Sequence, residues 1–233
     1  MKAYEIPAAE RYSKGKALVN MLNLKEEAIT NVLSIKDFED DLFMTTKKGI
    51  VKRISLKYFS KPRASGIRAI NLPADNSDSL IGVEIVKPKQ EVLLVTRRGL
   101  AIRFNSEEVR SMGRASYGVT GIKLNTSDEV VSIEVLLAGK TNETILSITE
   151  KGYGKRSGVE DYRITGRACK GVINLKVNEK TGRVVSSLAV ENKDSVIVTT
   201  VKGMVIRTPV KDLRVMGRAT QGVRIVKLHD GDK

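Results

Sequence analysis

The sequence contains few of the residues on which disulfide frameworks, zinc sites and membrane spans depend. Among 233 residues there is one cysteine, Cys169, and one histidine, His229. These are too few for a disulfide framework or a Cys/His zinc cluster. No apolar run approaches the roughly 18 residues of a membrane-spanning helix, and the first residues lack the apolar core of a signal peptide. These absences favour a reducing, cytoplasmic setting.

Aromatic residues are also scarce, whereas positive charge is abundant. Aromatics make up 4% of the chain and tryptophan is missing, while 41 Lys and Arg against 27 acidic residues give a net charge of +14. Such a surplus indicates a polyanionic partner, with nucleic acid first and an anionic membrane second. Proteins that bind single strands stack bases on aromatic side chains. The scarcity of aromatics therefore favours the phosphate backbone of a duplex.

A repeat of about 51 residues organises the chain. The motif Thr-x-x-Gly-x-x-x-Arg occurs four times, and its glycines are 50, 53 and 51 residues apart; it begins at Thr46, Thr96, Thr149 and Thr200. A second motif runs from an arginine to a glycine three or four residues later, and its glycines are 51, 52, 53 and 51 apart; it begins at Arg11, Arg63, Arg114, Arg167 and Arg218.

Each repeat is predicted to be all-β. Leu42–Thr46 and Ile50–Ile54 flank Lys48-Gly49, a pattern typical of a tight hairpin in which glycine adopts a positive φ. The same pattern, with further strands after it, predicts Val92–Thr96, Leu100–Phe104, Val119–Leu124, Val130–Leu136, Val172–Val177, Val184–Val190, Val196–Thr200 and Met204–Thr208. About four strands in each repeat indicate a propeller-like architecture of about five blade-like repeats. The alternative is a row of separate small β-modules, for which the linkers are too short.

We expect residues 1–233 to form one domain. Its units are predicted at residues 1–41, 42–91, 92–143, 144–194 and 195–233, of which the first and last are partial. The first unit lacks its hairpin and the last lacks a following strand. We therefore expect the chain to be part of a longer polypeptide.

The basic residues recur at fixed positions of the repeat. A radial array would place them on one edge, where Lys, Arg and nearby glycine N–H groups could contact duplex phosphates. The predicted DNA-binding residues are Lys47, Lys48, Arg53, Arg63, Arg97, Arg98, Arg103, Arg114, Lys151, Lys155, Arg156, Arg167, Lys170, Lys202, Arg207, Arg218 and Arg224. Bending ~40 bp through half a turn costs on the order of 10 kcal/mol, which several repeated patches could supply.

Each group of cations also has a structural interpretation. The turn residues, such as Lys48 and Arg98, could be solvated hairpin tips. The arginines four residues after the turn glycine, such as Arg103, could point at a neighbouring acidic loop. The arginines that begin the second motif, such as Arg167, could brace the connection between blades.

These motifs resemble the C-terminal domain of the A subunit of DNA gyrase, a type IIA topoisomerase. The resemblance covers the whole chain and rests most clearly on Lys2–Pro7, Leu42–Gly49, Leu93–Phe104, Met112–Leu124, Gly152–Arg156 and Met216–Arg224. It implies a β-pinwheel, which in the family has six blades with exchanged strands. It also implies that duplex DNA wraps around the basic rim and that this wrapping supports negative supercoiling. The C-terminal domain of topoisomerase IV and a propeller that docks an acidic protein are the alternatives.

One departure from the family concerns its basic seven-residue box, Gln-Arg-Arg-Gly-Gly-Lys-Gly, which lies in the first blade. This chain has only a partial match, Thr165–Gly171, in a later repeat. The resemblance further implies two partners, the remaining part of the gyrase A protein and the gyrase B protein. It implies that ATP and Mg²⁺ are used by those other parts, and that the isolated domain is a monomer without a cofactor.

No catalytic or metal-binding residue is predicted within the chain. The sequence has no Gly-x-x-x-x-Gly-Lys-Ser/Thr phosphate loop. Its acidic pairs, Asp40/Asp41, Glu107/Glu108 and Glu160/Asp161, fit surface loops better than a unique acid/base site. We therefore interpret the chain as a non-catalytic DNA-binding domain of an enzyme.

Overall fold

The computed structural model describes residues 1–22, 24, 28–63, 65–137, 139, 142–229 and 231–232. Within them the chain forms fourteen β-strands and six short 3₁₀ helices, and no α-helix. The strands make three four-stranded antiparallel sheets and one two-stranded sheet, which confirms the all-β prediction. None of the helices in this described part has the length and apolar character of a membrane span.

The four-stranded sheets share one plan. A hairpin stands in the middle, a strand of the same repeat lies on one side, and a short strand from the next repeat lies on the other. Across the first sheet the order is β3 (Leu80–Val86), β1 (Asp41–Thr46), β2 (Ile50–Ser55) and β6 (Val119–Thr120). Across the second sheet it is β7 (Val130–Leu136), β4 (Glu91–Thr96), β5 (Leu100–Asn105) and β10 (Val172–Ile173). Across the third sheet it is β11 (Val184–Val190), β8 (Thr144–Thr149), β9 (Tyr153–Gly158) and β14 (Val223–Arg224). The fourth sheet pairs β12 (Ser195–Thr199) with β13 (Val205–Pro209).

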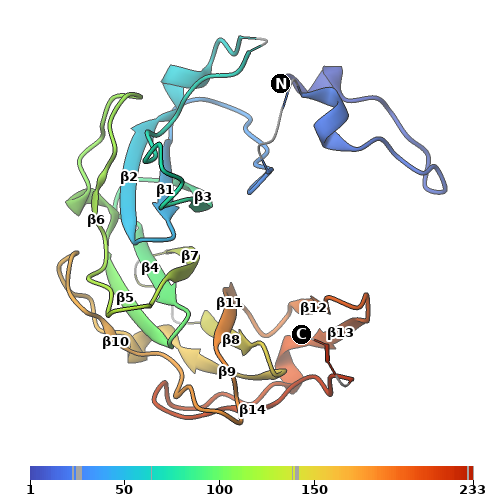
Figure 1. Cartoon of the computed structure of the whole chain (residues 1–233), viewed down its shortest axis with the longest axis vertical. Coiled ribbons are helices and arrows are strands. Elements are labelled where there is room, and N and C mark those ends of the chain that lie inside the picture. The colour runs from blue at the N-terminus through green and yellow to red at the C-terminus, as the bar shows by residue number, and fades with distance from the viewer. Residues whose placement is uncertain are drawn as a thin grey trace.

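The sheets stand side by side around an open arc (Figure 1). Strands β3, β7 and β11 face the inside of the arc, and the exchanged strands β6, β10 and β14 lie on its outside. The N-terminal segment, with η1 (Ala3–Glu5) and η2 (Leu18–Met21), extends away from the sheets at one end. The structure is thus propeller-like with strand exchange between blades, which is the predicted β-pinwheel.

Two exchanged strands are shorter than predicted because the chain turns over the neighbouring hairpin. The N–H groups of Gly121 and Ile122 both donate to the carbonyl oxygen of Gly49, at 2.8 and 3.4 Å. After this turn Ile122 enters the core, where it is 1% exposed. Leu175 does the same after β10, with its N–H on the carbonyl oxygen of Gly99. The strands therefore end at Thr120 and Ile173.

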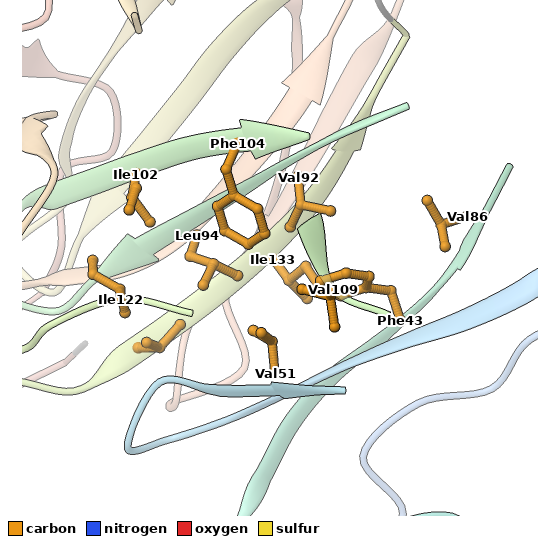
Figure 2. Packing of buried hydrophobic residues seen from close by; sticks show 11 residues of the cluster. Phe43, Val51, Val86, Val92, Leu94, Ile102, Phe104, Val109, Ile122 and Ile133 are labelled. Atoms are coloured by element: carbon orange, nitrogen blue, oxygen red, sulfur yellow. The ribbon is translucent and has the colours of Figure 1, made fainter. Parts of the chain in front are cut away.

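Each hydrophobic core lies between two adjacent sheets. Phe43 of β1 and Phe104 of β5 approach with their ring centroids 6.2 Å apart, and apolar side chains of both sheets surround them (Figure 2). A second cluster joins the next pair of sheets around Leu93, Ile145 and Tyr162. Burying each large apolar side chain is worth about 1.5–3 kcal/mol. Because the cores are shared, each blade is stabilised by its neighbour.

Candidate nucleic-acid interface

The hairpin tips carry the first group of predicted cations. At each tip a glycine adopts a positive φ, for example +81° at Gly99. At three of the four tips the N–H that precedes the glycine donates to an aspartate thirty residues later: Arg98 to Asp128 Oδ1 at 2.9 Å, Lys48 to Asp78 Oδ1 at 2.9 Å, and Lys202 to Asp232 Oδ1 at 3.0 Å. Sequence reasoning missed these aspartates, although their fixed offset from the tip was a usable signal. They hold the basic turns in one shape.

Acidic side chains partly neutralise the tips. Glu129 lies 2.9 Å from Lys47 Nζ and 2.7 Å from Arg97 NH1. Hydrogen bonds from Lys47 and then Arg97 hold the pKa of Glu129 below its ordinary value. The side chain of Lys48 is exposed. Three further tip residues also make hydrogen bonds. The side chains of Arg98 and Lys151 donate to the carbonyl oxygens of Thr126 and Glu179, and the backbone N–H of Lys202 donates to Asp232 Oδ1.

The arginines after the tips lie between blades. Arg103 Nε donates to Glu91 at 2.6 Å, and its NH1 donates to the carbonyl oxygens of Val159 and Tyr162 in the next repeat. Arg156 is 2% exposed and binds the carbonyl oxygens of Val210 and Leu213 in the same manner.

Arg53 contacts Asp41 at 3.1 Å and the carbonyl oxygen of Ser106. Arg207 is exposed, and its NH2 donates to Ser195 Oγ at 3.4 Å. Arg53, Arg103 and Arg156 thus connect each hairpin to the 3₁₀ turn of the following blade, and burial keeps Arg103 and Arg156 from an external ligand. The acid that Arg53 and Arg103 meet belongs to their own hairpin rather than to a neighbouring loop.

In three repeats the second motif forms loops on the outside of the arc (Figure 1), which we call the Arg–Gly loops; they are Arg114–Gly118, Arg167–Gly171 and Arg218–Gly222. Two of their arginines donate to the preceding exchanged strand: Arg167 NH1 to the carbonyl oxygen of Thr120 at 3.0 Å, and Arg218 NH1 to that of Ile173 at 2.8 Å. Arg63, Arg114 and Lys170 are exposed. The loops therefore brace the connection between blades, and they also present cations at the surface.

Two other predicted residues have different surroundings. Lys155 is 1% exposed and points into the protein, where burial lowers its pKa to about 8. Arg224 is exposed, with its guanidinium 5.4 Å from the centroid of the Tyr153 ring. The structure thus presents Arg224, but not Lys155, to a ligand outside the protein.

Two repeated cation positions escaped sequence reasoning. One arginine lies eight residues before the glycine of the Arg–Gly loop, and one lysine lies five residues after it; they are Arg110, Arg163 and Arg214, and Lys123, Lys176 and Lys227. All six side chains are exposed. The residue after each arginine bridges to β2, β5 or β9, and each lysine follows an exchanged strand. Their constant offsets from the loop glycine are visible in the sequence and are sufficient to identify them.

The cations of the Arg–Gly loops, and those of the segments just before and after them, follow the outside of the arc as one set. We call it the outer belt and define it as Arg110, Arg114, Lys123, Arg163, Arg167, Lys170, Lys176, Arg214, Arg218, Arg224 and Lys227. Nine of these eleven cations fall at three positions that recur in three successive blades, and only Lys170 and Arg224 do not recur. Evenly repeated positive charge along a curved edge is suited to a long polyanion.

Comparison with known proteins gives the same family as the motifs. A family model described as the DNA gyrase C-terminal domain, beta-propeller, matches residues 1–36, 40–87, 90–136, 143–191 and 194–233. The DNA gyrase A protein of Chlamydia pneumoniae is 42% identical over 238 residues, which cover 100% of this chain and 28% of that protein. The DNA gyrase A protein of Salmonella typhimurium is 40% identical over 230 residues, covering 97% of this chain and 26% of that protein.

Solved structures support the assignment. A DNA gyrase A C-terminal domain superimposes with a TM-score of 0.84 at 27% identity, covering 100% of this chain and 75% of that one. A C-terminal domain of DNA topoisomerase IV superimposes with a TM-score of 0.83 at 27% identity, covering 91% of this chain and 66% of that one. Because the family model matches nearly every residue in five successive segments, the chain belongs to the DNA gyrase C-terminal domain family.

Proposed function

We propose that this chain binds duplex DNA along the outer belt, with the basic hairpin tips as further contacts, without sequence specificity, and that it bends or wraps the duplex. The observation that supports this most directly is the return of exposed Arg and Lys at the same positions of successive blades. Ionic contacts to phosphates fix the register of a duplex but carry no sequence information. Spaced around an arc, they favour a curved path over a straight one.

Within a larger enzyme this activity would support ATP-dependent negative supercoiling. The relatives that match the chain are gyrase A proteins, and the chain spans only 28% of the first of them. We infer that its partners are the remaining part of the gyrase A protein and the gyrase B protein. Those parts would use ATP and Mg²⁺, and the domain itself would need no cofactor. A cytoplasmic, nucleoid-associated location follows from that role, and the isolated domain would be a monomer.

Salt dependence tests the binding. A duplex ligand held by phosphate contacts gives a log K that falls steeply with log salt, by about 0.9 for each phosphate neutralised. The triple variant Lys123→Ala/Lys176→Ala/Lys227→Ala should flatten this slope by two to three units, equally on unrelated sequences. The matched control removes three exposed lysines outside the belt, Lys36, Lys87 and Lys193. Equal losses in both triples, or an affinity independent of salt, would contradict the proposal, and tighter binding to an acidic protein would favour the docking alternative.

DNA topology tests the wrapping. Nicked plasmid closed by ligase in the presence of the chain should show a changed linking number, and the sign of the change gives the handedness of the wrap. A chain that binds duplex at saturation and leaves the linking number unchanged would contradict wrapping. That result would favour the topoisomerase IV alternative, for which the similar solved domain is a specific reason.

A further inference from the structure

Two lysines are buried at one position of the repeated hairpin. Lys52 lies opposite Met44 in the first hairpin, and Lys155 lies opposite Ser147 in the third. Their exposed fractions are 0% and 1%. Neither ammonium can reach a ligand outside the protein.

Each ammonium is held by the Arg–Gly loop of the next repeat. Lys52 Nζ donates to the carbonyl oxygens of Arg114 and Ser116, at 2.7 and 3.0 Å, and to that of Ala69 at 2.7 Å. Lys155 Nζ donates to the carbonyl oxygens of Arg218 and Gly217, at 2.5 and 2.9 Å. Its third bond, at 2.8 Å, goes to a hydroxyl of its own strand, Ser157. All three donors of each ammonium are therefore used, two of them on or directly before a loop that carries an arginine of the outer belt.

The hairpin itself does not require a lysine here. The same register position holds Ile102 opposite Leu94 in the second hairpin and Ile206 opposite Val198 in the fourth. Ile102 is 1% exposed, so an apolar side chain fills this place in an equivalent sheet. The loop beside Ile102 is held differently, because the backbone N–H of Arg167 donates to Glu108 Oε2 at 2.9 Å.

Burying an ammonium costs free energy that burying an apolar side chain does not, so a lysine at this position indicates a contribution that an apolar side chain cannot make. Burial lowers the pKa of both lysines, which shows that desolvation disfavours their charged form. Replacing a buried charge by a well-packed apolar group is often neutral or stabilising. What the lysines add, and isoleucine cannot, is a set of directed hydrogen bonds to the main chain of the loop.

We propose that Lys52 and Lys155 are positioning residues of the DNA-binding surface. Each fixes the main chain of one Arg–Gly loop, so that Arg114 in one blade and Arg218 in another face the duplex in a defined orientation. This inference rests on the proposed function, and it gives each buried lysine one specific arginine through which it acts.

Double-mutant cycles on duplex affinity test this pairing. In the full 233-residue chain, Lys155→Met should weaken binding roughly three- to tenfold and flatten the salt slope by about one unit, as the loss of one phosphate contact does. Combined with Arg218→Ala it should add little, because the arginine it positions is gone. Combined with Arg114→Ala it should keep its full effect. Lys52→Met should add little to Arg114→Ala and should keep its full effect when combined with Arg218→Ala. Ile102→Met is the matched control, and its affinity should be unchanged.

The outcomes separate the two hypotheses. If the unsubstituted chain does not bind duplex, the proposed function fails and this inference fails with it. If that chain binds but each lysine variant is additive with both arginine variants, only the positioning role is overturned. Should Lys155→Met fail to fold, the Lys52→Met cycle decides alone. Faster amide exchange in residues 114–118 of Lys52→Met, with residues 218–222 unchanged, would support the role, and unchanged exchange in both loops would overturn it.

Discussion

Arg97 and Glu129 form an ion pair at one hairpin tip, with NH1 and Oε1 2.7 Å apart. The other oxygen of the same carboxylate lies 2.9 Å from Lys47 at the tip of the preceding blade. One acid therefore links two basic tips and cancels part of their charge. The side chains of Lys47 and Arg97 are 49% and 39% exposed, so each pair contributes less than about 1 kcal/mol to stability. The larger effect is on the positive charge that the two tips present at the surface.

Removing this acid should tighten DNA binding. We expect Glu129→Gln to raise duplex affinity about threefold at low salt, because Lys47 and Arg97 become available to phosphates. The measurement is a titration of labelled duplex at several salt concentrations. Glu107→Gln, at an exposed glutamate, makes the same change in net charge. Equal gains in both variants would show that only net charge matters and that the tips do not contact DNA.

The buried pair of Arg103 and Glu91 should matter for stability rather than for binding. Their side chains are 11% and 7% exposed, and their nitrogen and oxygen atoms lie 2.5 Å apart. Arg103→Ala leaves the Glu91 carboxylate buried without its partner, which should cost about 3–5 kcal/mol. Urea unfolding measures the loss. The double variant Arg103→Met/Glu91→Met should recover much of it, and a single variant as stable as the original chain would contradict the assignment.

Arg163 should behave in the opposite way. Its side chain is exposed on the outer belt, so Arg163→Ala should change the free energy of unfolding by less than about 0.5 kcal/mol. It should weaken duplex binding and reduce the salt slope by about one unit. Both quantities can be measured on one preparation. A loss of stability with unchanged binding would remove Arg163 from the belt.

The repeat was readable from the sequence because its signals are local. The turn at Gly99 needs only a basic residue, a glycine and two flanking apolar runs, and the structure forms it as predicted. The contacts of Arg103 could not be read in this way, because its carbonyl partners lie 56 and 59 residues further along the chain. Lys155 and Arg156 are adjacent in one strand, so their side chains point to opposite faces, and pattern alone could not say which faces are covered.

Strand exchange was the other property that the pattern could not give. Val119–Leu124 reads as a strand of its own repeat, yet β6 pairs with β2 of the preceding one. The bonds that hold this segment against the preceding hairpin, from Met112 to Arg53 and from Gly121 to Gly49, join residues far apart in the sequence. By contrast, the regular offsets of Arg163 and Lys176 were present in the sequence, and a full comparison of the repeats would have placed them in the candidate site.

Gly171 should be essential for the exchanged strand β10. Its φ is +79°, and an added Cβ would overlap the carbonyl oxygen of Ala101 in β5. Gly171→Ala should therefore lower the free energy of unfolding by about 1–3 kcal/mol and loosen the pairing of β10 with β5. Gly217→Ala is the control, since a Cβ there meets nothing within 4 Å. Equal unfolding midpoints for the two variants would contradict the assignment.

Glu134 should make stability depend on pH at the inside of the arc. Its Oε2 accepts the N–H of Ala189 in β11 at 3.0 Å, which joins β7 to the next blade. Burial, with smaller contributions from Glu84 and Glu143, raises the pKa of Glu134 from 4.5 to about 7 against the opposing effect of that hydrogen bond. The folded state thus binds this proton more tightly than the unfolded state, and the stability it gives below pH 4.5 is lost as pH rises through 7.

Glu134→Gln keeps the acceptor oxygen and removes the titration. At about pH 8 it should be more stable than the original chain by on the order of 2 kcal/mol, because the original must bury a carboxylate. Towards about pH 5 the difference should close, since Glu134 is then protonated in the folded state. Urea unfolding at both pH values measures this, with Glu179→Gln at an exposed position as the control. A stability difference that is the same at both pH values would show that Glu134 does not titrate in this range and that its bond to Ala189 does not respond to pH.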